Sequence, residues 1–77
     1  MSNRDKLTVT SGGPWRLYQH AVIPGWEMLG TVQRGDEIGA LVRVKATGIL
    51  VMMRAGIVSS LNQRKARSAL EAAHRGA

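Results

Sequence analysis

The 77-residue sequence contains no cysteine and no phenylalanine, and aromatic residues make up only 4% of it. The absence of cysteine excludes a disulfide and is typical of proteins that work in a reducing compartment. The two histidines, His20 and His74, lie far apart in the sequence, so we expect no metal site. A chain of this length builds one modest core. Without a disulfide or a metal site, self-association is the remaining way to stabilise such a core.

Long apolar segments are also missing. No apolar run approaches the roughly 20 residues that cross a bilayer. Apart from Met1, the first six residues are polar, unlike the apolar stretch of a secretory signal. We therefore expect a cytoplasmic protein without a membrane partner.

Acidic residues are scarce, with five Asp and Glu against eleven Lys and Arg. Asp36 and Glu37 are adjacent in a segment typical of a turn, where Asp serves local backbone hydrogen bonds and not catalysis. Ser59 and Ser60 have no histidine nearby in the sequence that could activate them. The glycines form no phosphate-binding loop motif. These absences predict a protein that is not an enzyme and uses neither a cofactor nor a small-molecule substrate.

The apolar pattern predicts an α+β domain, a three- to five-stranded antiparallel β-meander packed by one C-terminal α-helix. Residues 1–13 end in a polar stretch with two glycines and indicate a flexible N-terminal arm, so the single domain is expected over residues 14–77. The predicted strands include residues 15–23, 26–33 and 38–45 and a short final strand over residues 56–61. In the second of these strands, alternation predicts one face shared by Trp26, Met28, Gly30 and Val32.

A hairpin with the two-residue loop Thr47-Gly48 is predicted after the strand over residues 38–45. Its register makes one face wholly apolar, with the pairs Val44–Val51, Val42–Met53 and Ala40–Ala55. The other face mixes cations with apolar groups, in the pairs Lys45–Leu50, Arg43–Met52 and Leu41–Arg54.

A helix is predicted between Gln63 and Arg75. It begins either with a capping box of Ser60 and Gln63 or with Asn62 alone as the N-cap. Its apolar stripe consists of Ala66, Ala69, Leu70 and Ala73. One helix covers one face of a sheet, so we expect the mixed face to stay open and to form an oligomer or partner interface, with a homodimer as the simplest case. The interface residues predicted on that face are Leu41, Leu50 and Met52.

Positive charge is concentrated in the second half of the chain. Residues 1–37 carry four basic and four acidic side chains, whereas residues 38–77 carry seven basic side chains and the single acid Glu71. Three cations fall at the start of the predicted helix, where the helix dipole disfavours cations but favours a bound anion. The pattern predicts a nucleic-acid-binding surface formed by Arg64, Lys65 and Arg67 and extended by Arg43, Lys45 and Arg54. The alternative is that these side chains extend into solvent and serve solubility.

The large aromatic residues are Trp15, Tyr18 and Trp26. Such residues can stack on bases. Packing is the favoured interpretation, because a small domain without phenylalanine needs its few large side chains for burial.

Several short runs are spaced as in known small proteins. They are Leu29-Gly30-Thr31-Val32, Gly39-Ala40-Leu41-Val42, Thr47-Gly48, Ala55-Gly56 and Ser60-Leu61-Asn62-Gln63-Arg64-Lys65. Over residues 25–70 the chain resembles short proteins of phages and other bacterial mobile elements, some of which are anti-CRISPR inhibitors. The resemblance implies a host-directed inhibitor or regulator that occupies a surface, and it assigns no functional residues.

Together these features predict a small, non-enzymatic binding protein that engages nucleic acid or a host nucleoprotein complex through its basic surface. The alternative is a protein–protein interaction module or a structural homo-oligomer, whose basic face meets an acidic surface of another protein.

Overall fold

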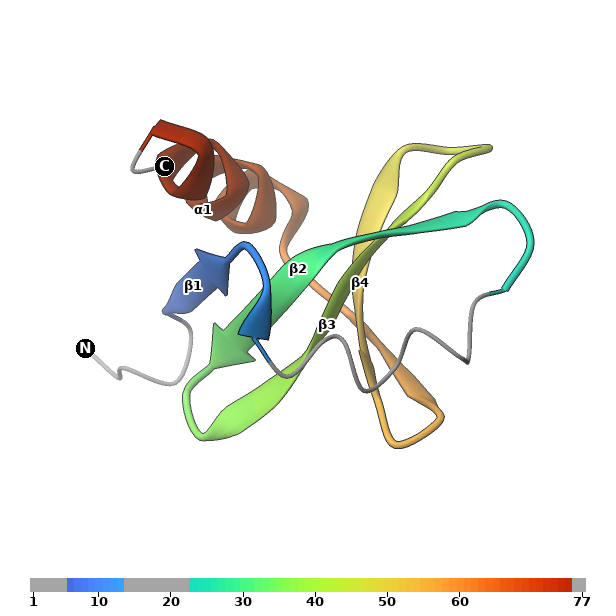
Figure 1. The fold of residues 1–77 in the computed structure, drawn as a ribbon, viewed down its shortest axis with the longest axis horizontal. Helices are drawn as coiled ribbons and strands as arrows, with labels where there is room; N and C mark the ends of the chain where they lie inside the picture. Colours follow the sequence, from blue (N-terminus) through green and yellow to red (C-terminus); the bar gives the residue numbers. More distant parts are fainter. Residues whose placement is uncertain (1–5, 14–22, 76–77) are drawn as a thin grey trace.

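Five strands and one helix make up the part of the chain that the structure, a computed structural model, describes: residues 6–13 and 23–75. In chain order they are β1 (Leu7–Thr10), β2 (Trp26–Arg34), β3 (Glu37–Val44), β4 (Ile49–Arg54), β5 (Ile57–Ser60) and α1 (Gln63–Arg75). The strands pair antiparallel in the order β1-β2-β3-β4-β5, and α1 packs against β1 and β4 (Figure 1). The predicted α+β class is confirmed, with the five-stranded form of the meander. Among the described residues, no helix is long and apolar enough to cross a membrane.

The flexible arm predicted over residues 1–13 is wrong for Leu7–Thr10, which form β1 at the edge of the sheet. Val9 pairs with Val32 of β2 and is buried. Two apolar side chains spaced two residues apart suffice to bury one face of a four-residue strand, but the pattern is too short to stand out beside two glycines. The strand predicted over residues 15–23 lies, apart from Ile23, outside the described residues.

The strand predicted over residues 26–33 is present as β2, but its faces change partway along. The register of β2 against β3 shifts between Met28 and Gly30, which marks a β-bulge. An inserted residue reverses the direction of the side chains that follow it. Val32 therefore lies on the opposite face from Met28, and the single face predicted for Trp26, Met28, Gly30 and Val32 is wrong.

The β3–β4 hairpin is present, but its register differs from the predicted one by two residues. The observed pairs are Ala40–Met53, Leu41–Met52, Val42–Val51, Arg43–Leu50 and Val44–Ile49. The loop spans residues 45–48, and the Val44 carbonyl accepts the backbone N–H groups of Thr47 at 3.2 Å and Gly48 at 2.7 Å. A two-residue loop needs a positive φ at its first residue, which threonine disfavours. Because side chains alternate with a period of two, the slip leaves each residue on its predicted face.

The sheet buries a different apolar cluster on each side. The helix face, which packs against α1, is formed by Val9, Val32, Leu41, Leu50 and Met52, with Leu61 and Ala66. The outer face carries Ala40, Val42, Val51 and Met53, with Trp26 and Met28 packed against them.

The prediction that α1 leaves Leu41, Leu50 and Met52 uncovered is therefore wrong. These three side chains are 0%, 1% and 1% exposed and lie in the core beneath the helix, so almost none of their surface is open to another molecule. The cations that share their face, Arg43 and Arg54, sit at the ends of the strands, where long side chains extend beyond the buried centre. A mixed face can thus have an apolar centre that a helix covers.

The start of α1 is tied to the sheet by one side chain. Asn62 is the N-cap, the second of the two predicted starts, and its Oδ1 accepts the Lys65 backbone N–H at 3.1 Å. The Gln63 side chain reaches β4, where Oε1 accepts the Leu50 N–H at 2.8 Å and Nε2 donates to the Leu50 carbonyl at 2.7 Å. Nε2 also donates to the Leu61 carbonyl at 2.9 Å. Because β5 ends at Ser60, this amide continues the pairing of β4 in place of a strand.

Candidate nucleic-acid interface

The outward surface of α1 carries cations because its inward surface is taken up by small apolar residues. Ala66 is fully buried, and the rest of the predicted stripe packs against the same cluster: Ala69, Leu70 and Ala73. The helical period places Arg64, Lys65 and Arg67 outside this stripe, and all three are exposed. The structure thus brings together three of the six predicted site residues: Arg64, Lys65 and Arg67. We call these three residues the helix cations.

The helix cations form no ion pair with any residue in the described ranges. The first turn of α1 contains no acidic side chain that could neutralise them. Unsatisfied backbone N–H groups and the helix dipole add positive potential at this end. Stability alone would favour acidic residues there, so the arrangement suits the binding of an anion supplied from outside. Arg75 is different, because cations are favourable in the last turn of a helix.

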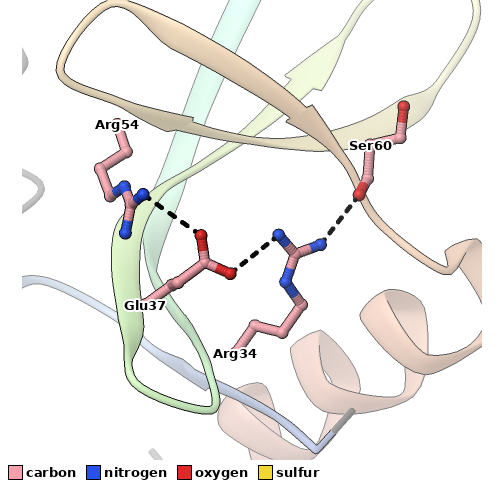
Figure 2. Close-up of polar contacts among 4 residues, drawn as sticks. All are labelled: Arg34, Glu37, Arg54 and Ser60. Carbon is pink, nitrogen blue, oxygen red and sulfur yellow. Dashed lines mark hydrogen bonds and ion pairs between the residues drawn. The ribbon is translucent and has the colours of Figure 1, made fainter. Parts of the chain in front are cut away.

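Arg43 and Arg54, the two predicted site residues on strands, are each paired with a carboxylate. Arg43 Nη2 lies 2.6 Å from Oε2 of Glu27, its cross-strand partner in β2. Arg54 Nη2 lies 3.2 Å from Oε2 of Glu37 in β3 (Figure 2). These two residues therefore do not extend the helix cations as free charges, contrary to the prediction. The strand register and the fold bring Glu27 and Glu37 to these arginines. The spacing of charges along the chain does not predict these pairs.

A third arginine, Arg34, was not singled out from the sequence. Its Nη2 donates to Glu37 Oε1 at 3.1 Å and its Nη1 donates to the Ser60 carbonyl at 3.2 Å (Figure 2). Arg34 and Glu37 flank a two-residue turn, and this spacing was the available signal for their pairing. The contact with Ser60 joins β2 to β5, which are not neighbours in the sheet, so the sheet curls toward itself here. We call Arg34, Arg43 and Arg54 the sheet arginines.

The remaining predicted cation, Lys45, is exposed in the β3–β4 loop. Its backbone N–H donates to the Gly25 carbonyl at 2.9 Å, which fixes the start of the loop. Figure 1 shows this loop well apart from α1. Lys45 therefore does not join the helix cations in one patch.

Packing is confirmed for one of the three aromatic residues. Trp26 is half-buried and lies against the outer-face cluster. Trp15 and Tyr18 lie outside the described residues.

The part of the chain that the structure describes holds no group of three His, Asp or Glu side chains placed to bind a metal ion. Comparison with protein-family models, with curated proteins and with solved structures found no match to this chain. The candidate site therefore rests on the geometry of this chain itself.

Proposed function

We propose that this protein binds nucleic acid through the exposed start of α1 and performs no catalysis. The observation that carries the proposal is the contrast in pairing: each sheet arginine has a carboxylate partner, whereas the helix cations have none among the described residues. Phosphate groups are the natural counterpart of cations that converge on a helix N-terminus. The protein contributes Arg64, Lys65 and Arg67 to this interface.

Binding of this kind depends on the release of counterions. A protein that neutralises several phosphates loses affinity steeply as salt increases, with a slope of about −0.9 per phosphate on a plot of log K against log salt. Because the helix cations contact the backbone charge of the ligand, they supply affinity and orientation, while sequence preference would need contacts to base edges. We therefore expect binding with little sequence preference.

The test compares two variants that each lose three positive charges. In R64Q/K65Q/R67Q the helix cations are neutralised, and in R43Q/R54Q/R75Q an equal charge is removed elsewhere. Affinity for a short duplex DNA is measured by fluorescence anisotropy between ~50 and ~200 mM salt. If each helix cation contacts one phosphate, the first variant should make the negative slope shallower by about 2.7. The second variant should leave the slope near that of the wild type. An equal loss in both variants would show attraction by net charge alone and would overturn the proposed interface.

The biological role that extends this proposal is inhibition or regulation of a host nucleoprotein complex, as the resemblance to small mobile-element proteins implies. Such a protein acts by occupying a surface of its target. A pull-down with and without nuclease separates the cases: capture through nucleic acid is lost on nuclease treatment, whereas capture through an acidic protein surface persists.

A second candidate function, self-association, is favoured by the outer face. Three large apolar side chains there are 44–46% exposed: Ile38, Ile49 and Val58. All three are uncharged, so two copies of the face can meet without like-charge repulsion, and such an interface would reinforce a small core. Sedimentation at micromolar concentration tests this: a homodimer in the wild type and a monomer in Ile49→Lys would support it, and a wild-type monomer would overturn it.

A further inference from the structure

A cavity of about 280 Å³ lies between β1, the end of β2 and the start of α1. Its lining residues are Leu7, Arg34, Asn62 and Lys65. Two of the four are cations and none is a carboxylate. They come from three separate segments, which shows that the folded arrangement, and not one helical turn, creates the site.

One wall of the cavity is a guanidinium with a fixed orientation. Arg34 uses one N–H for the Ser60 carbonyl and one for Glu37, so three of its five N–H groups have no such acceptor in the described ranges. The Glu37 carboxylate is shared with Arg54, so the three side chains together keep a net charge of +1. Figure 2 shows Arg34 held between Glu37 and Ser60.

The cation contributed by α1 is Lys65. Its backbone is anchored, because its N–H donates to Asn62 Oδ1, while its ammonium group forms no ion pair in the described part of the chain. An ammonium offers three donors and the Asn62 amide offers two more. Cationic residues therefore line the cavity from two elements, β2 and α1, and Leu7 of β1 adds an apolar residue.

We propose that this cavity binds one phosphate group between Arg34 and Lys65. The inference rests on the proposed function for the origin of that group, a phosphate of the bound nucleic acid; a small phosphorylated molecule would offer the same chemistry. The volume is close to the lower end of the ~300–1,000 Å³ range of small-ligand pockets, which suits a phosphate with its attached sugar. Arginine binds such a group through paired N–H donors, and lysine adds a point charge.

The test uses the full chain and inorganic phosphate as the probe, followed by nuclear magnetic resonance. Saturable shifts are expected at the backbone amides of Leu7, Asn62 and Lys65. Lys65→Gln is expected to weaken phosphate binding about tenfold, which is the loss of one charge-assisted hydrogen bond. Lys45→Gln is the matched control, because it removes the same charge and the same type of side chain from the β3–β4 loop, which does not line the cavity. Arg34→Lys retains charge but loses the paired donors, and it is also expected to weaken binding.

The outcomes separate this inference from the function on which it rests. Loss of phosphate shifts in Lys65→Gln but not in Lys45→Gln, with displacement of phosphate by a short duplex DNA, supports both. Equal loss in the two variants, or shifts spread evenly along α1, overturns the cavity as a site. DNA binding without shifts at Leu7 and Asn62 overturns the cavity and leaves the proposed function standing. Phosphate binding in the cavity without any DNA binding overturns the nucleic-acid source and assigns the site to a small phosphorylated ligand.

Discussion

In the sheet, each of the three sheet arginines lies within 3.2 Å of a carboxylate oxygen. On α1, the helix cations form no ion pair with any residue that the structure describes. An exposed ion pair stabilises a fold by only about 0–1 kcal/mol. It also offsets charge toward an external ligand, because the two carboxylates, Glu27 and Glu37, leave the three sheet arginines a net charge of +1. The total charge of +6 therefore overstates the unpaired positive charge that the sheet presents to a ligand. The positive charge at the start of α1 is the part that a ligand can meet.

The largest expected effect follows from adding a cation to the sheet where no carboxylate can reach it. Leu50 is 1% exposed beneath α1, so Leu50→Lys buries an unpaired charge and should cost about 4 kcal/mol or more. A domain of this length has a total stability of roughly 4–12 kcal/mol, so the variant should lose about a third of that stability or more. Circular dichroism with urea titration measures this.

The control for that variant is its neighbour on the opposite face. Ile49 is 45% exposed, and at concentrations at which the wild type is monomeric Ile49→Lys should change the free energy of unfolding by no more than about 0.5 kcal/mol. Similar losses in both variants would contradict the assignment of the two faces.

A smaller loss of stability is expected from Gln63→Ala, which removes the side chain that connects α1 to β4. The side chain satisfies both backbone groups of buried Leu50, and its removal should cost about 2–4 kcal/mol. Gln63→Glu keeps the acceptor for the Leu50 N–H but places a carboxylate oxygen against the Leu50 and Leu61 carbonyl oxygens, so its loss should be at least as large. Faster hydrogen exchange of the Leu50 amide would report the same contact, and unchanged exchange would contradict it.

A charge reversal at the start of the helix should increase stability. Arg64→Glu places an acid in the first turn, where the dipole favours it, and should raise the free energy of unfolding by about 0.3–1 kcal/mol at low salt. The same variant should weaken binding to duplex DNA, so stability and binding change in opposite senses. Arg75→Glu is the control and should be destabilising, because it removes a cation from the last turn. High salt should reduce both effects, and identical signs for the two variants would count against the dipole as the cause.

The smallest effect is expected from Glu37→Gln, which releases two sheet arginines at once. The Glu37 side chain is 39% exposed, so solvent screens its pairs with Arg34 and Arg54, and the loss should stay below about 1 kcal/mol. Thermal melts at low and high salt measure the loss, with Glu27→Gln as the control that releases Arg43. The released arginines should also steepen the salt dependence of DNA binding, and an unchanged slope would show that they lie outside the interface.

Much of the fold could be predicted from local patterns. The helix bounds and the strands after residue 25 follow from apolar periodicity, which is a property of neighbouring residues. The register of the β3–β4 hairpin was predicted two residues off because the loop length was wrong. A two-residue and a four-residue loop put the same residues on each face, so the apolar pattern does not distinguish them. β1 was missed because two apolar residues carry too little periodic signal, and the bulge in β2 was missed because it interrupts that signal.

The candidate site was predictable only in part. The three helix cations lie within four consecutive residues, so any helix over this segment brings them together. The pairing of Arg43 with Glu27 joins residues 16 apart, and the contact of Arg34 with Ser60 joins residues 26 apart. Such contacts depend on strand register and on the curl of the sheet, neither of which a charge pattern encodes.

By itself, the sequence determined the elements after residue 25, the apolar stripe of α1 and the cluster of cations at the start of that helix, because each depends on residues a few positions apart. The tertiary structure decided which face of the sheet the helix covers and which arginines are paired with carboxylates. It also brought Arg34 and Lys65 to one cavity from elements about thirty residues apart in sequence. These features depend on distant segments meeting at a common core, where the geometry of packing chooses among arrangements that the local pattern allows equally.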